Sequence, residues 1–69
     1  MNQNEIIAFH TFAEQILGAM WENCDESTHL YHNEHYIGGW AGDERKFFIC
    51  DGDYVAKLVR MYDIYTGEA

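Results

Sequence analysis

Proline is absent from this sequence, basic residues are few, and no long hydrophobic run occurs. The lack of proline excludes rigid proline-rich linkers. Two cysteines, Cys24 and Cys50, allow one disulfide at most, so the chain does not fold around a disulfide framework. No apolar segment approaches the roughly 20 residues of a membrane-spanning helix, and the N-terminus lacks the basic start and apolar core of a signal peptide. We therefore expect a cytoplasmic protein with reduced thiols.

The charge balance is the strongest feature of the composition. Twelve acidic residues against four basic ones give a formal net charge of −8. Direct binding of nucleic acid needs a basic surface, and an acidic protein is repelled by anionic membranes. The acidic residues are dispersed through the chain and do not form an acidic tail. We therefore expect a basic or nucleic-acid-binding protein as the partner, and neither nucleic acid nor a membrane.

Residues 4–23 have the periodicity of one amphipathic helix. Apolar residues recur at alternating steps of three and four, which is the spacing of a helix face and not of a strand. These residues are Ile6, Phe9, Ala13, Ile16 and Met20. Asn2 can cap the start of this helix, with Glu5 three residues later as in a capping box. The rest of the chain then has to cover the apolar face.

Three later segments have the character of short strands, about 28–32, 35–41 and 45–50. Asn33 and Glu34 fit a turn between the first two, and a glycine-containing loop separates the last two. Gly38 and Gly39 inside a strand indicate a bulge or the close approach of another backbone. Residues 47–49 are apolar on both faces, which is typical of a strand that is central, covered on both sides, or paired at an interface.

A second helix is expected over about 53–65. Asp51 or Asp53 can cap its start, and Gly67 is placed to end it. The order helix, strands, helix favours a single α+β domain over residues 1–69. We expect a small two-layer domain with an N-terminal helix, a two- or three-stranded antiparallel meander and a C-terminal helix.

Three histidines recur at a spacing of three, with a cysteine shortly before them: Cys24, His29, His32 and His35. Imidazole and thiolate groups are good ligands for zinc and other transition metals. Structural zinc sites, however, usually contain close cysteine or histidine pairs that are missing here. Partly exposed strand and turn histidines are therefore the favoured interpretation, and a small metal-binding protein remains an alternative. No cofactor is expected.

No set of residues points to an enzyme. His10 lies on the apolar arc of the first helix near Trp21, and we expect it to pack on its ring, with Glu14 able to pair with it. Cys24 or Cys50 could combine with a histidine and a carboxylate as a nucleophile and base, but such ingredients occur in almost any chain of this size. A small domain also has little room for a pocket of about 300 Å³ or more. We expect no catalytic residue.

Acidic and aromatic residues alternate through the strand region and the start of the second helix. Carboxylates can take the place of phosphates in a basic groove, and aromatic rings supply anchoring contacts. The candidate partner-binding residues are Glu34, Tyr36, Trp40, Asp43, Glu44, Asp51 and Asp53. The alternative is that the rings face the core and the acids only solvate the outside. A domain this small is not expected to bury all its aromatic residues, and exposed rings among acids indicate an interface.

In size, acidity and lack of proline and of a catalytic set, the chain resembles the small acidic inhibitors that phages and mobile elements encode. Anti-restriction proteins, anti-CRISPR proteins and other nucleic-acid mimics belong to this type. The resemblance is one of type only, because no stretch of residues carries it, and it transfers no residue assignment. It implies an inhibitor that occupies the basic site of a nucleic-acid-handling protein, in the cytoplasm of the host cell.

A homo-oligomeric structural or regulatory protein is the other alternative. In a homodimer, the apolar arc of the first helix and the two-faced strand at residues 47–49 would meet a second copy of themselves.

Overall fold

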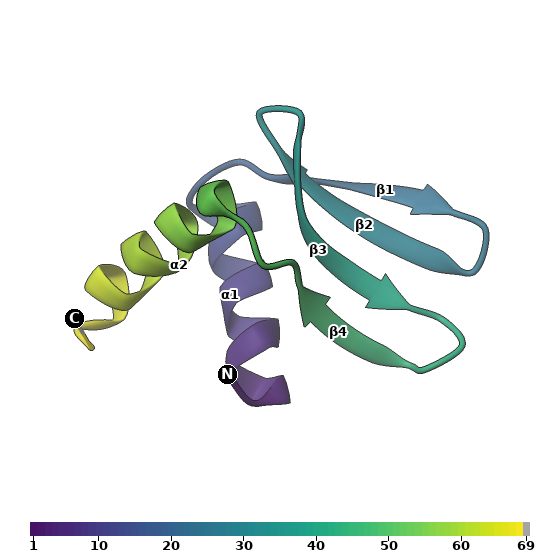
Figure 1. The fold of residues 1–69 in the computed structure, drawn as a ribbon, viewed down its shortest axis with the longest axis horizontal. Coiled ribbons are helices and arrows are strands. Elements are labelled where there is room, and N and C mark those ends of the chain that lie inside the picture. The colour runs from purple at the N-terminus through teal and green to yellow at the C-terminus, as the bar shows by residue number, and fades with distance from the viewer. Residues whose placement is uncertain (69) are drawn as a thin grey trace.

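The computed structural model describes residues 1–68 and consists of a helix, four antiparallel strands and a second helix (Figure 1). In chain order the elements are α1 (Gln3–Gln15), β1 (Met20–Cys24), β2 (Ser27–His32), β3 (His35–Ala41), β4 (Lys46–Ile49) and α2 (Asp53–Thr66). The strands lie side by side in sequence order, which makes the sheet a meander. The α+β class and the order of elements are confirmed, with four strands where two or three were expected. Neither helix described within residues 1–68 has the length and apolar character of a transmembrane segment.

The first helix is shorter than the sequence predicts. α1 ends at Gln15, and residues 20–23 of the expected helix belong to β1 instead. Gly18 adopts a φ of +75°, a conformation that costs glycine little and is typical of the end of a helix. Ile16 and Met20, expected on the buried face, are 55% and 74% exposed. The helical spacing of apolar residues therefore continues past Gly18, although the backbone there is no longer helical.

The ends of the helices are only partly as predicted. Asn2 Oδ1 accepts a hydrogen bond from the Glu5 N–H at 2.9 Å, so the N-cap of α1 is confirmed. At the start of α2, Gly52 is the N-cap residue and no side chain caps the helix. The prediction that Asp51 or Asp53 provides the cap is therefore wrong. Gly67 ends α2 with a φ of +82°, as expected.

Two-residue turns join the first three strands. The β2–β3 turn at Asn33 and Glu34 is confirmed, and both residues have positive φ, the signature of a type I′ hairpin turn. The β1–β2 turn consists of Asp25 and Glu26, with Asp25 at a φ of +52°. This second hairpin was not predicted, because the expected helix extended over β1.

The glycine pair in β3 allows close backbone contacts, as expected. A Cβ on Gly38 would lie 2.3 Å from the Phe48 carbonyl oxygen, and one on Gly39 would lie 2.2 Å from the Thr28 carbonyl oxygen. Beside them the β2–β3 register shifts, which leaves Ile37 as the extra residue of a bulge. The side chain of Ile37 is fully buried.

β4 is an edge strand, so the interpretation as a central strand is wrong. Its apolar side chains are nevertheless half-buried on both faces. Phe47 packs towards α1, where its ring centroid lies 5.4 Å from that of His10. Phe48 lies on the opposite face, 6.3 Å from the ring of Tyr36. The apolar residues of this strand thus reflect the cover by α1 and by aromatic neighbours rather than two flanking strands.

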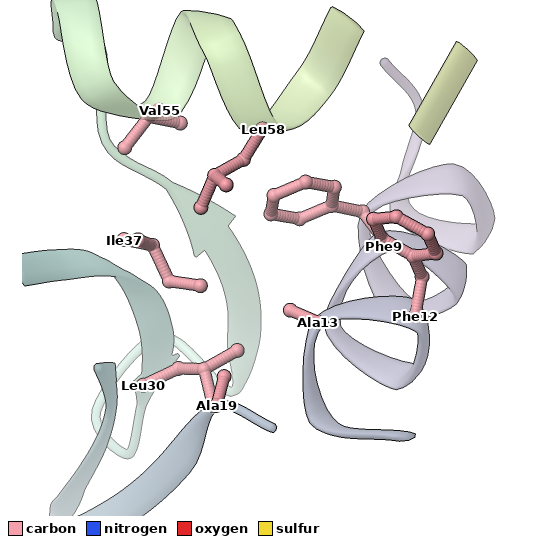
Figure 2. Close-up of a cluster of buried hydrophobic side chains, with 8 residues drawn as sticks. All are labelled: Phe9, Phe12, Ala13, Ala19, Leu30, Ile37, Val55 and Leu58. Carbon is pink, nitrogen blue, oxygen red and sulfur yellow. The ribbon is translucent and has the colours of Figure 1, made fainter. Parts of the chain in front are cut away.

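The hydrophobic core lies between the two helices and one face of the sheet (Figure 2). Its buried side chains are Phe9, Phe12, Ala13, Ala19, Leu30, Ile37, Val55 and Leu58. Phe9 is fully buried and packs edge-on against Tyr62 of α2, with ring centroids 5.8 Å apart. Because strand side chains alternate, His29 and Tyr31, next to Leu30 in β2, point to the opposite face of the sheet. In the described chain no helix covers that face.

Candidate functional site

Two hairpin turns lie at the same end of the sheet, and both carry acidic residues (Figure 1). Gly42 brings the turns together, since a Cβ at this position would lie 1.9 Å from the Glu26 carbonyl oxygen. Only glycine permits this approach. We call the resulting group of exposed carboxylates the acidic end; it consists of Asp25, Glu26, Asp43 and Glu44.

Trp40 lies beside the acidic end. It is half-buried and lines an open hollow of about 480 Å³ together with Asp25 and Glu26. Arg45 also lines this hollow, so one basic side chain lies among the acidic ones. Asp25, Glu26 and Asp43 line a neighbouring hollow of about 580 Å³. The structure therefore brings the predicted residues Trp40 and Asp43 close to Asp25 and Glu26, two acids that the sequence analysis left out. Glu44 follows Asp43 in the same loop.

The other acidic candidates lie at the opposite end of the strands. Glu34 is in the β2–β3 turn, Asp51 follows β4 and Asp53 begins α2. All three are exposed. The seven candidate residues thus do not form one continuous surface, because β3 and β4 separate these acids from Asp43 and Glu44.

Two histidines at this opposite end hold α2 against the β2–β3 hairpin. His32 and His35 face each other across the turn. The Tyr54 ring of α2 stacks on His35 with centroids 4.0 Å apart, and its hydroxyl forms a hydrogen bond with His32 Nδ1. These contacts give the two histidines a packing role.

Tyr36, the second aromatic candidate, lies on the sheet face opposite to Trp40. It is the centre of a half-buried cluster, which we call the aromatic face: His29, Tyr31, Tyr36 and Phe48. The Tyr36 hydroxyl forms a 3.0 Å hydrogen bond with His29 Nδ1. Burial raises the pKa of Tyr36 to about 12, and the neighbouring Cys50 side chain acts in the same direction. The hydroxyl is therefore neutral and available as a hydrogen-bond donor near neutral pH.

The possible metal ligands are separated by the strand geometry. His29 and His32 point to opposite faces of β2, because side chains alternate along a strand. Cys24 lies beside the acidic end, whereas His32 and His35 flank the turn at the other end. Within residues 1–68, no group of three or more His, Cys, Asp or Glu side chains is arranged to hold a metal ion.

His10 is a buried residue of the core boundary and is only 2% exposed. Its Nε2–H donates to the Phe48 carbonyl oxygen at 3.0 Å, and Nδ1 finds no partner among residues 1–68. Burial lowers the pKa of His10, opposed by the bond to Phe48. Glu14 instead accepts a hydrogen bond from Trp21 Nε1 at 3.0 Å, so the predicted pair of Glu14 with His10 is wrong.

A further hollow of about 670 Å³ lies beside the start of β1 and is open to solvent. Its volume exceeds the pocket size of about 300 Å³ for which little room was expected in so small a domain. Its lining residues are Gly18, Met20, Trp21, Glu22, Tyr31, Asn33 and Glu34. Met20 and Tyr31 are direct neighbours across β1 and β2. We call this hollow the β1 groove; of the sequence candidates it contains Glu34 alone.

Asp25 and Glu26 are the residues that the sequence analysis missed. It assigned them to the break after a long helix, where acids have no special meaning. The signal that could have identified them was Gly18 as a helix stop, since a strand at residues 20–24 makes Asp25 and Glu26 the tip of a hairpin.

Comparison with known proteins gives no match: no protein-family model, no curated protein and no solved structure matches the chain.

Proposed function

We propose that the protein is a small, non-enzymatic, acidic protein-binding module that inhibits a nucleic-acid-handling protein by occupying its basic site. The observation that carries this proposal is the contact between Gly42 and Glu26, which packs two hairpin turns together. The contact gathers the acidic end beside Trp40. Carboxylates would then replace nucleic-acid phosphates, and the indole ring would supply an anchoring contact.

The backbone of the acidic end favours such binding because it is held in place before the partner arrives. Asp43 Oδ1 accepts a hydrogen bond from the Glu44 N–H at 3.0 Å, which orders the β3–β4 loop. Arg45 N–H donates to the Ala41 carbonyl oxygen at 2.7 Å at the base of the same loop. A preorganised surface loses less conformational entropy on binding. The net charge of −8 would also speed the approach of a basic partner.

The proposal is tested by replacing charges without changing shapes. In one variant, all four carboxylates of the acidic end become amides: Asp25→Asn, Glu26→Gln, Asp43→Asn and Glu44→Gln. The tagged protein is used to capture partners from a cell lysate, and bound proteins are challenged with excess DNA or RNA. We expect the wild type to capture a nucleic-acid-binding protein that polynucleotide releases, and the variant to lose it.

A matched control removes the same number of charges at four exposed acids outside both the acidic end and the β1 groove: Glu5, Asp51, Asp53 and Glu68. This control should still capture the partner. If the acidic-end variant captures as well as the wild type, or if polynucleotide has no effect on the complex, the proposed function is wrong. If the control alone loses capture, the binding surface lies outside the acidic end.

A homodimer is the second candidate. The surfaces that suggested it in the sequence are used within the monomer, because α1 packs its phenylalanines into the core and covers β4. A different surface supports it: Met61, Ile64 and Tyr65 of α2 are 46%, 64% and 62% exposed. Sedimentation showing only monomer at micromolar concentration would remove this candidate, whereas a dimer dissociated by Ile64→Lys would support it.

A further inference from the structure

The two edges of the sheet differ in whether another strand can reach them. The outer edge of β4 is occupied by the side chain of Gln3. Its Nε2 donates to the Phe47 carbonyl oxygen at 2.8 Å, and its Oε1 accepts from the Phe47 N–H at 3.2 Å. A neighbouring strand would form this same pair of hydrogen bonds. β4 is therefore closed to further strand pairing.

The outer edge of β1 is open in the described chain. β1 pairs with β2 alone, and four of its five residues are exposed. The β1–β2 pairing is regular, without a bulge, and the strand contains no proline or lysine. Bulges, prolines and lysines are the features by which natural edge strands commonly block pairing with other chains. β1 therefore presents an unblocked row of main-chain groups.

The register shows which main-chain groups of β1 face outwards. Cys24 and Ser27 close the two-residue hairpin and form the first hydrogen-bonded pair. Because hydrogen-bonded and non-hydrogen-bonded pairs alternate in an antiparallel ladder, Trp21 and Asn23 direct their N–H and C=O groups away from β2. Phe47 in β4 follows the same alternation, since its outward groups bind Gln3.

The β1 groove shows what kind of side chain such an added strand would carry. The groove is lined by the aromatic ring of Tyr31 and the thioether side chain of Met20. Glu22 and Glu34 add two carboxylates. None of the lining residues is basic. A guanidinium or ammonium group suits this combination, because it binds both an aromatic ring face and carboxylate oxygens.

We propose that an extended, arginine- or lysine-containing segment of the partner protein adds to β1 as a further strand and places a cationic side chain in the β1 groove. This inference rests on the proposed function and specifies the partner's binding mode. β1 leads directly from the groove into the acidic end at Asp25, so one extended segment can contact both. A second copy of the chain fits less well. Antiparallel pairing about the centre of β1 would place Glu22 opposite its own counterpart, and like charges in that position repel.

The test uses a short synthetic peptide in which arginine and threonine alternate. Its control is the same peptide with N-methyl groups on alternate backbone nitrogens, which keeps the charge and removes the strand-pairing donors. Amide exchange is followed by NMR, and affinities come from titration. We expect the first peptide to protect the Trp21 and Asn23 amides from exchange, and the methylated peptide to bind about tenfold more weakly or worse.

Two variants of the protein complete the test. Glu22→Gln with Glu34→Gln should weaken peptide binding by about tenfold, whereas Glu5→Gln with Glu68→Gln, outside the groove, should not. Asn23→Pro removes one outward donor and should prevent strand addition while circular dichroism shows an intact fold. Equal binding of the two peptides, with Trp21 and Asn23 unprotected, would overturn the inference. So would protection of these amides that rises with protein concentration without peptide, because β1 would then pair with a second copy.

The lysate capture separates this inference from the proposed function. If Asn23→Pro and the Glu22/Glu34 variant capture the polynucleotide-releasable partner as well as the wild type, strand addition is overturned and the proposed function stands. If the acidic-end variant retains the partner, the proposed function fails, whatever the peptides show.

Discussion

His10 Nε2 donates a hydrogen bond to the carbonyl oxygen of Phe48 at 3.0 Å, which ties α1 to β4 at the boundary of the core. Gly38 leaves the space for this contact, since a Cβ there would lie 3.2 Å from His10 Nε2. The carbonyl acceptor requires the proton on Nε2, so Nδ1 of the neutral ring is a buried acceptor without a partner in the described chain. Protonation of this imidazole would therefore place an N–H at the buried Nδ1, where no described residue accepts its hydrogen bond.

Acidification is expected to destabilise the protein through His10. Burial lowers the pKa of His10 from its ordinary value of 6.5. The unfolded chain then takes up a proton near pH 6.5 that the folded protein resists, so the stabilising contribution is complete above this pH and is lost as the pH falls towards the lowered pKa. Urea denaturation from about pH 8 to 5 should show a shallower loss in His10→Leu than in the wild type. Equal slopes would contradict the prediction, because the other histidines are present in both proteins.

Gly38→Ala should destabilise the fold by about 3 kcal/mol. The added methyl would overlap the Phe48 carbonyl oxygen at 2.3 Å, and the φ of +154° is unfavourable for any residue but glycine. Gly18→Ala is the matched control, since φ is +75° and no atom lies within 4 Å of the added Cβ. Its cost should be about 1 kcal/mol from the backbone alone. Urea denaturation of both variants measures the difference, and equal losses would show that the close contact relaxes.

Gln3→Ala should open the edge of β4. Losing the two hydrogen bonds with Phe47 is expected to cost about 1 kcal/mol, since these groups are exposed and water replaces the bonds. Amide exchange at Phe47 should become faster. Gln15→Ala, at the exposed opposite end of α1, should change neither the thermal midpoint nor this amide. An unaltered Phe47 exchange rate in Gln3→Ala would show that the glutamine does not close the edge.

Tyr36→Phe should remove a phenolate titration step well above pH 10. Burial raises the pKa of Tyr36 to about 12 from 10.0, so in the folded protein its phenolate absorbance should appear only near that pH. Because the folded pKa is raised, the stabilising contribution is present below pH 10 and is lost as the pH rises towards 12. Ultraviolet titration should lose the step near pH 12 in the variant. If that step persists, another tyrosine produces it.

The strands around Asn33 could be predicted because their signals are local. A type I′ turn needs positive φ at two positions, and Asn33 and Glu34 supply it. The extent of α1 could not be predicted from its apolar period, because Ile16 and Met20 keep the spacing of a helix face while Gly18 ends the helix. That single error also hid a strand, a hairpin and the two acids Asp25 and Glu26.

The candidate site was predicted in part. The acidic–aromatic composition identified Trp40, Asp43 and Glu44, which lie at one end of the sheet, and also Glu34, Asp51 and Asp53, which lie at the other end of the strands. The order of residues along the chain does not show which loops lie at the same end of the sheet. The histidine run was separated for a related reason, because alternation along β2 sends His29 and His32 to opposite faces.

The α+β class, the order of elements, the N-cap at Asn2 and the acidic charge follow from the amino-acid sequence, since these depend on composition and on residues a few positions apart. The sheet order, the burial of His10 and the grouping of acids at one end follow only from the folded arrangement. These depend on contacts between distant residues, such as Gly42 with Glu26 and Gln3 with Phe47. Such contacts form only when the register of every strand is set, and a shift by one residue would reverse which side chains face the core.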